Sequence, residues 1–171
     1  MLSGIEYKSV LLAYNICTEC TDILIMEVEV LTMLLETKFT DARRDFTALY
    51  NRVYADALPT IVKRHRDEEI VLVKRELQEA ILQAFCFRPE VINETDGSIT
   101  IAIDELELVV NQDDREAAIL DLINEIKIYA QEYQQRMQVF LNAPNRKNHL
   151  PYLMRIWLCN SDDDIRKLLG L

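Results

Sequence analysis

Glycine and proline are scarce in this sequence of 171 residues. There are three glycines, Gly4, Gly97 and Gly170, and four prolines. Sandwich and barrel folds need more of these residues at their many turns. The glycines also lie too far apart to form the G-x-G-x-x-G or G-x-x-x-x-G-K-[ST] loops that hold nucleotide phosphates. The sequence therefore argues against a turn-rich all-β fold and excludes these phosphate-binding loops.

Basic residues are also in the minority, with 19 against 29 acidic residues and a net charge of −10. The charges are unevenly distributed: residues 38–66 carry seven bases and three acids, whereas residues 67–135 carry five bases and 17 acids. An acidic chain repels phosphate groups, so indiscriminate binding to nucleic acid or to anionic membranes is disfavoured. We interpret the alternating blocks as helices that pair with one another or between subunits.

Long uncharged hydrophobic runs are missing. The most apolar stretch, residues 23–35, contains Glu27 and Glu29, and a helix that crosses a bilayer needs about 20 nearly uncharged residues. The N-terminus has no basic segment followed by a short apolar run, so it does not resemble a secretory signal. We therefore expect a soluble, cytoplasmic protein that does not bind membranes.

Residues that typically form metal and catalytic sites are few. Cys17-Thr-Glu-Cys20 has the spacing of a metal or redox pair, but it lies within an apolar segment and no second C-x-x-C follows. We favour buried packing cysteines and keep a cysteine-dependent metal or redox protein as a weaker alternative. His65 and His149 lack the carboxylate spacing of helical metal sites, and no serine lies in G-x-S-x-G or S-x-x-K. The sequence predicts no enzyme, catalytic residue, cofactor or metal.

Helical periodicity dominates the first half of the chain. Residues 5–36 predict a long central helix that is apolar on most sides, and a second helix is predicted from Thr40 or Asp41 to about residue 57. A third is predicted over residues 60–87, because apolar residues repeat there every three or four positions. Its predicted helix-packing seam contains Ile70, Val73, Leu77, Ile81, Ala84 and Phe85.

The periodicity changes to two between residues 90 and 110, which predicts two or three short strands. Asp96-Gly97 favours a two-residue hairpin turn, which places Ile92 opposite Ile101. A fourth helix is predicted from Asp113 or Asp114 to about residue 142, with a heptad seam from Ile119 to Phe140. Two short helices follow, and we expect the second to be capped by Ser161.

These elements predict a single, mostly α-helical domain over residues 1–171. We expect an elongated bundle of long antiparallel helices with coiled-coil seams and a small β-hairpin insertion near residues 90–110. Its predicted parts are N-terminal helices in 1–88, the hairpin insertion in 89–111, a long helix in 112–143 and short C-terminal helices in 148–171. One chain of this length cannot bury the apolar faces of all these helices. Self-association is therefore predicted.

The C-terminal residues favour a protein interface, because aromatic residues, methionine and arginine are enriched there. The alternative is that these helices dock on their own bundle. The candidate interface residues are Tyr152, Met154, Trp157, Leu158, Leu168 and Leu169.

We therefore predict a non-enzymatic assembly or adaptor protein that acts through protein–protein contacts, as a homo-oligomer, with another protein, or both. The alternative is a nucleic-acid-associated accessory subunit that uses the basic block 38–66, where Phe46, Tyr50 and Tyr54 are available to stack on bases. In the opposing interpretation the tyrosines face the core and the arginines pair with acids of later helices. The candidate phosphate-binding residues are Arg43, Arg44, Lys63, Arg64 and Arg66.

Overall fold

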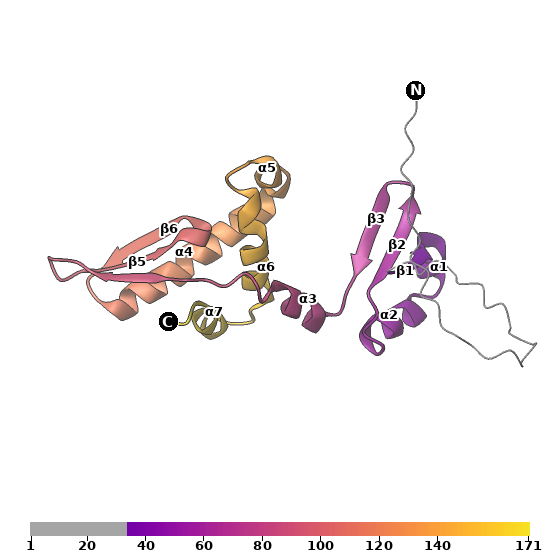
Figure 1. Cartoon of the computed structure of the whole chain (residues 1–171), viewed down its shortest axis with the longest axis horizontal. Helices are drawn as coiled ribbons and strands as arrows, with labels where there is room; N and C mark the ends of the chain where they lie inside the picture. The colour runs from indigo at the N-terminus through magenta and orange to yellow at the C-terminus, as the bar shows by residue number, and fades with distance from the viewer. Residues whose placement is uncertain (1–33) are drawn as a thin grey trace, which may run out of the picture. The chain divides into compact units, whose positions relative to one another are not determined.

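The computed structural model describes residues 34–171, which form an α/β fold (Figure 1). Helices account for 53% and strands for 21% of it, and the strands form two three-stranded sheets. The prediction of an elongated helical bundle with a hairpin insertion is therefore wrong. The predicted central helix over residues 5–36 lies outside the described residues except at its end, where Leu35 and Glu36 belong to strand β1.

The first region, residues 34–72, contains one sheet and two helices. Strand β1 pairs in parallel with β2, and β2 pairs antiparallel with β3. Parallel neighbours need a crossover connection, and two short helices provide it. The elements are β1 (Leu35–Lys38), α1 (Phe39–Arg44), α2 (Phe46–Tyr54), β2 (Thr60–His65) and β3 (Glu68–Leu72).

The predicted second helix is divided into α1 and α2 at Asp45. The Asp45 carboxylate accepts a hydrogen bond from the Ala48 amide at 2.9 Å, so a residue placed inside one helix instead caps another.

The predicted third helix over residues 60–87 is also wrong. Its first half forms β2 and β3, and only α3 (Arg75–Leu82) is helical. Side chains at Thr60, Ile61 and Val62 are β-branched and suit a strand. The predicted seam does not exist, because Ile70 is in β3 and both Ile70 and Ile81 are exposed.

The second region, residues 75–171, begins with α3 and contains an antiparallel meander of β4 (Glu90–Asn93), β5 (Ile99–Ile103) and β6 (Leu108–Gln112). The strands form where the alternation predicted them, but they are not an insertion. One face of the sheet packs on α4 (Arg115–Gln135), which runs along it (Figure 1). Ile101 and Ile103 are completely buried in this contact region.

The hairpin between β4 and β5 differs from the predicted register by one residue. Ile101 pairs with Val91, and Ile92 pairs with Thr100. Glu94 and Ser98 close a loop of three residues, and the last of these, Gly97, has φ +92°. A three-residue loop with glycine in this conformation is a common hairpin alternative to the two-residue turn.

Helix α4 carries most of the apolar residues of the predicted fourth helix into the core. Its buried positions include Ile119, Leu122, Ile126 and Tyr133, but they pack against the sheet and the C-terminal helices rather than in a coiled coil. The Asp114 carboxylate caps the helix through the Ala117 amide at 2.9 Å. The predicted helix to residue 142 is interrupted at Arg136 and continues as α5 (Met137–Asn142).

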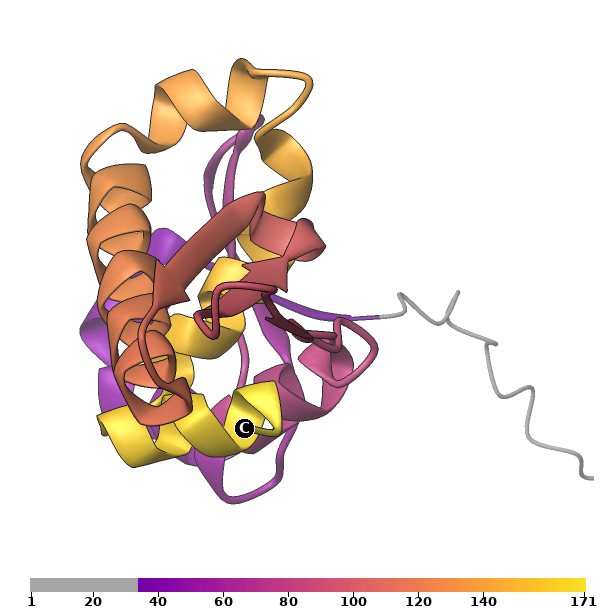
Figure 2. The same cartoon turned by 90° about the vertical axis from the view of Figure 1, so that its left-hand side faces the viewer.

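The last two helices, α6 (Leu150–Leu158) and α7 (Asp162–Leu169), complete this core. Ser161 caps α7 as predicted, accepting from the Asp164 amide at 3.2 Å. Figure 2 shows α7 beside α4, and two ion pairs join these helices: Arg166 to Glu116 at 2.7 Å and Lys127 to Asp162 at 2.9 Å. Among residues 34–171, no helix has both the length and the apolar character needed to cross a membrane.

Candidate functional site

An exposed aromatic stripe lies on α2. Phe46, Tyr50 and Tyr54 are four residues apart and therefore lie on one side of the helix. Their exposed fractions are 61%, 53% and 55%. The rings of Tyr50 and Tyr54 stack with centroids 5.5 Å apart, and the Lys74 ammonium lies 4.8 Å from the centre of the Tyr54 ring. The packed side of α2 provides Leu49, which is buried, and Val53, which packs beside it, whereas the stripe is exposed.

Strand β3 adds further exposed apolar residues. Ile70 and Val71 project to opposite faces of the sheet, and they are 60% and 55% exposed. In the described residues β3 pairs only with β2, which makes it an edge strand. Edge strands with exposed apolar side chains favour pairing with other chains.

The first region as a whole exposes more large apolar side chains than it buries. Its buried core consists of Ala42, Leu49 and Val62. Apolar side chains left exposed over so small a core are typical of a protein-interaction site. The large hydrophobic residues that it exposes are Leu34, Leu35, Phe39, Phe46, Tyr50, Tyr54, Leu58, Ile70 and Val71.

The predicted phosphate-binding residues all lie in this first region. Arg43 and Arg44 are at the end of α1, Lys63 and Arg64 are in β2, and Arg66 is in the turn that follows. A hollow of about 740 Å³ brings Lys63 and Arg64 together with Lys38. The guanidinium of Arg64 also lies 5.5 Å from the centre of the Phe39 ring.

These basic residues do not pair with acids of later helices. Arg44 contacts Asp41 of its own helix at 2.9 Å, and Arg64 contacts Glu68 at 3.8 Å. Lys63 lies 2.8 Å from Glu36 and 3.1 Å from Glu69, and these hydrogen-bonded carboxylates raise its pKa. Within residues 34–171, Arg43 and Arg66 form no ion pair.

The predicted C-terminal interface residues pack largely within the chain. Leu169 belongs to the buried core, and Tyr152, Trp157 and Leu168 pack against it. Met154 and Leu158 are partly buried. The described part of the chain thus gives these residues intramolecular contacts, and their role in a protein interface stays a prediction.

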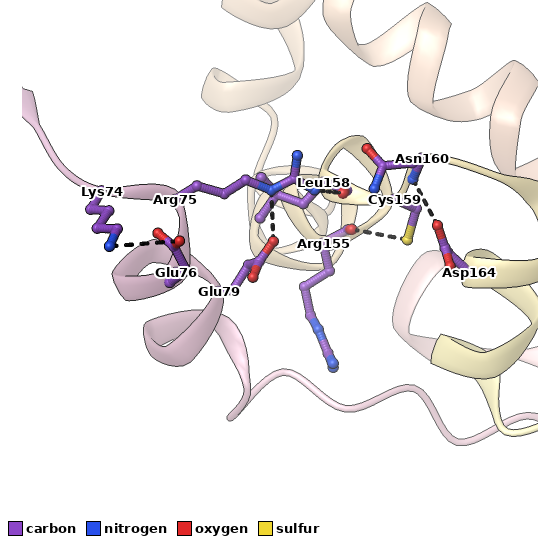
Figure 3. Close-up of polar contacts among 9 residues, drawn as sticks. All are labelled: Lys74, Arg75, Glu76, Glu79, Arg155, Leu158, Cys159, Asn160 and Asp164. Atoms are coloured by element: carbon purple, nitrogen blue, oxygen red, sulfur yellow. Dashed lines mark hydrogen bonds and ion pairs between the residues drawn. The ribbon is translucent and has the colours of Figure 1, made fainter. Parts of the chain in front are cut away.

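A cleft of about 320 Å³ is lined by residues of α3, α6 and α7. Figure 3 shows its polar side chains: Arg75 donates to Glu79 at 2.8 Å and to the Leu158 carbonyl, and the Cys159 thiol lies 3.4 Å from the Arg155 carbonyl. Arg155 also donates to the Phe85 carbonyl at 2.6 Å. Burial raises the pKa of Cys159, which keeps the thiol protonated. These contacts fasten α3 to α6 and supply no activated nucleophile.

The candidate cysteine pair, Cys17 and Cys20, lies outside the described residues. Cys86 and Cys159 are free thiols, and no group of three metal-ligating side chains occurs within residues 34–171. His65 is exposed, whereas His149 is buried with its Nδ1 2.8 Å from the Tyr129 hydroxyl.

The exposed strand β3 is not expected from the periodicity of residues 60–87, which predicts one helix. The signal was present in the β-branched composition of residues 60–71. The exposure of the aromatic stripe has no comparable sequence signal, because a four-residue spacing is equally typical of a buried helix face.

The comparisons with known proteins agree on one class. A family model described as "Antitoxin of toxin-antitoxin, RelE / RelB, TA system" matches residues 33–171. A crystal structure described as an antitoxin part of a proposed toxin/antitoxin system, from Syntrophomonas wolfei subsp. wolfei, is 29% identical with a TM-score of 0.70. The match covers 79% of this chain and 96% of that one. A search of curated proteins returns no match. Because the family model spans more than half of the sequence, this chain belongs to the PHD-like family of toxin–antitoxin antitoxins.

Proposed function

We propose that this chain is an antitoxin that binds a toxin protein and self-associates through its first region. Membership of an antitoxin family indicates a non-enzymatic regulatory protein with a protein partner. The observation that supports self-association is the apolar surface of residues 34–72, where nine large hydrophobic residues are exposed and three apolar residues form the buried core. Protein partners are the usual cover for such a surface.

Self-association has its own physical basis. Units of fewer than about 40 residues seldom bury enough apolar surface to be stable alone, and oligomerisation is a common remedy. The first region has three buried apolar residues. A two-fold pairing would cover the aromatic stripe or the edge strand β3 of both copies at once.

Toxin binding is tested with the product of the gene adjacent to that of this chain, as the candidate toxin. We expect that protein to arrest growth when it is expressed alone, and growth to recover when the chain is expressed with it. The two purified proteins should also form a stable complex in gel filtration. Recovery of growth without a complex would contradict neutralisation by direct binding.

Self-association is tested by light scattering of the purified chain. We expect a dimer or larger assembly that Tyr50→Glu and Ile70→Glu shift toward the monomer. Leu120→Glu is the matched control, because Leu120 is equally exposed, at 56%, but lies on α4 of the second region. A wild-type monomer at micromolar concentration would contradict self-association.

A second candidate function is nucleic-acid binding through the basic block 38–66. It is favoured by the exposed Arg43 and Arg66, which form no ion pair within residues 34–171, and by the aromatic stripe on the same region. Exposed arginines contact phosphates, and exposed aromatic rings stack on bases. We expect a mobility shift at low salt that weakens steeply as salt rises, and that Arg43→Glu with Arg44→Glu abolishes. No shift at low salt would exclude this function.

A further inference from the structure

One face of the sheet β4–β5–β6 is open. The strand register places Glu90, Ala102 and Val109 in one row and Ile92, Thr100 and Asn111 in another. These six residues alternate with an inward row on the side of α4, in which Ile101 and Val110 are buried and Val91 is partly buried. We call them the outer face. Val109 is 65% exposed and Ile92 is 41% exposed, so apolar side chains meet solvent on both edge strands.

Hydrogen bonds hold the polar side chains at one end of the outer face in place. Asn111 donates to Ser98 and to Thr100, each at 2.9 Å. Thr100 donates to the Glu94 carboxylate at 2.6 Å, and Ser98 donates to the Asp96 carboxylate at 2.8 Å. Hydrogen bonds from Ser98 lower the pKa of Asp96 and keep it charged. Two carboxylates are thus positioned before any partner arrives, which reduces the entropy lost on binding.

The meander around this face is strongly acidic. Between residues 88 and 114 the sequence has one base, Arg88, and eight acids. Among these acids, Glu107 alone forms an ion pair within residues 34–171, with Arg146 at 3.4 Å. The acids are Glu90, Glu94, Asp96, Asp104, Glu105, Glu107, Asp113 and Asp114.

This charge decides which kind of partner fits. Nucleic acid would be repelled by the acids. A second copy joined by a two-fold axis would bring the same face onto itself, with Glu90, Glu94 and Asp96 against like charges. Basic side chains on another protein complement the face, because Arg and Lys pair with fixed carboxylates.

From these observations we propose that the outer face is the toxin-docking surface, and that its partner is a basic protein surface whose arginines or lysines surround an apolar contact. The inference rests on the proposed antitoxin function and adds the place of contact and the chemistry of the partner. Val109 and Ile92 form the apolar centre of the interface, and Glu90, Glu94 and Asp96 form its charged rim.

The test measures the dissociation constant by titration calorimetry, using the full chain and the product of the adjacent gene. Val109→Arg is expected to weaken binding by at least about tenfold, because it places a cation at the centre of the contact. Glu94→Gln keeps a hydrogen-bond acceptor and removes the charge, so it isolates the electrostatic contribution. We expect it to weaken binding and to reduce the dependence of affinity on salt.

Two control variants match these changes away from the outer face. Leu120→Arg places a cation on α4 at a position that is 56% exposed, and Asp163→Asn removes an exposed charge from α7. Both should bind within about twofold of the wild type. Circular dichroism verifies that each variant is folded, and if Val109→Arg is not, Val109→Lys and Glu90→Lys replace it.

The possible results distinguish the proposed antitoxin function from the proposed docking surface. If the wild type does not bind the candidate toxin, the antitoxin function with that toxin fails and the docking surface fails with it. If the wild type binds and the outer-face variants bind equally well, the docking surface alone is overturned. If Val109→Arg instead changes the mass of the free chain in light scattering, the face is an interface between copies, and the proposal is again overturned.

Discussion

The two regions of this protein differ most in how much apolar side chain they bury. The first region, residues 34–72, has a buried cluster of three residues, whereas the cluster of the second region contains sixteen. Both regions have a three-stranded sheet and helices on one of its faces. The same kinds of element bury a larger core in the second region, where the long helix α4 covers the sheet.

This difference suggests that the two regions have different functions. The first region has a basic block and exposed aromatic residues over a small core. The second region is stable enough to present fixed side chains on its outer face, because rigid elements position binding groups better than loops do. This difference underlies our proposals of self-association through the first region and toxin docking on the second.

The largest expected effect is the loss of a core residue of the second region. Leu122 is fully buried on α4, so Leu122→Ala should reduce the free energy of unfolding by about 3–4 kcal/mol, through lost burial and a residual cavity. Urea unfolding followed by the fluorescence of Trp157, the one tryptophan of the sequence, measures this change. The exposed Leu120→Ala should cost less than about 0.5 kcal/mol. Equal losses of unfolding free energy at Leu122 and Leu120 would contradict the assignment of Leu122 to the core.

The next effect concerns the core of the first region. Leu49 is 4% exposed, and Leu49→Ala should destabilise this region by about 2 kcal/mol, because its small core relaxes more easily. If self-association stabilises the region, the loss should shrink as protein concentration rises. Hydrogen exchange measured by mass spectrometry resolves the two regions. If exchange in residues 34–72 does not depend on protein concentration, the result argues against self-association through the first region.

A pH effect is expected from His149 in the second region. Burial, and then the charge of Arg146, lower the pKa of His149 below its ordinary value of 6.5. The unfolded chain therefore binds the proton more readily than the folded chain does. The stabilisation is complete above pH 6.5 and is lost as pH falls from there toward the folded-state pKa, by at most about 1.4 kcal/mol per pH unit.

Matched substitutions at the two histidines test this effect. His149→Gln should flatten the dependence of unfolding free energy on pH between 7.5 and 5.5, to an extent measurable by urea titration at each pH. His65→Gln is the matched control, because it removes an exposed imidazole from the first region. An unaltered slope in the His149 variant would assign the pH dependence to other groups.

The smallest effect is expected at the start of α4. The Asp114 carboxylate accepts from the Ala117 amide, so Asp114→Ala should cost about 1 kcal/mol of unfolding free energy. Asp113 precedes it and makes no side-chain hydrogen bond within residues 34–171, so Asp113→Ala should change little. If both variants lose the same amount, general helix-dipole electrostatics rather than capping explains the loss.

Parts of the site followed from the sequence and parts did not. The basic and aromatic composition of residues 38–66 indicated a candidate surface, and the structure places all five of its predicted basic residues in the first region. The outer face was not predicted, because the side of a strand that faces solvent depends on what packs on the other side. The one-residue error in the hairpin register would have placed Ile92 and Ile101 together, although Ile101 is buried and Ile92 is exposed.

Local features were predictable from the sequence: a cap at Asp113 or Asp114, the cap at Ser161, most buried positions of α4 and the alternation of the strands at residues 99–103 and 108–112. These depend on interactions within a few residues, so the pattern is sufficient to predict them. The strand partners of residues 60–72 depend on the assembled fold, because β2 pairs with β1 25 residues away and β3 pairs with β2. Leu49 and Val62 also pack in one buried cluster. The exposure of side chains and the position of partner surfaces also depend on the assembled fold, and spacing along the chain does not predict them.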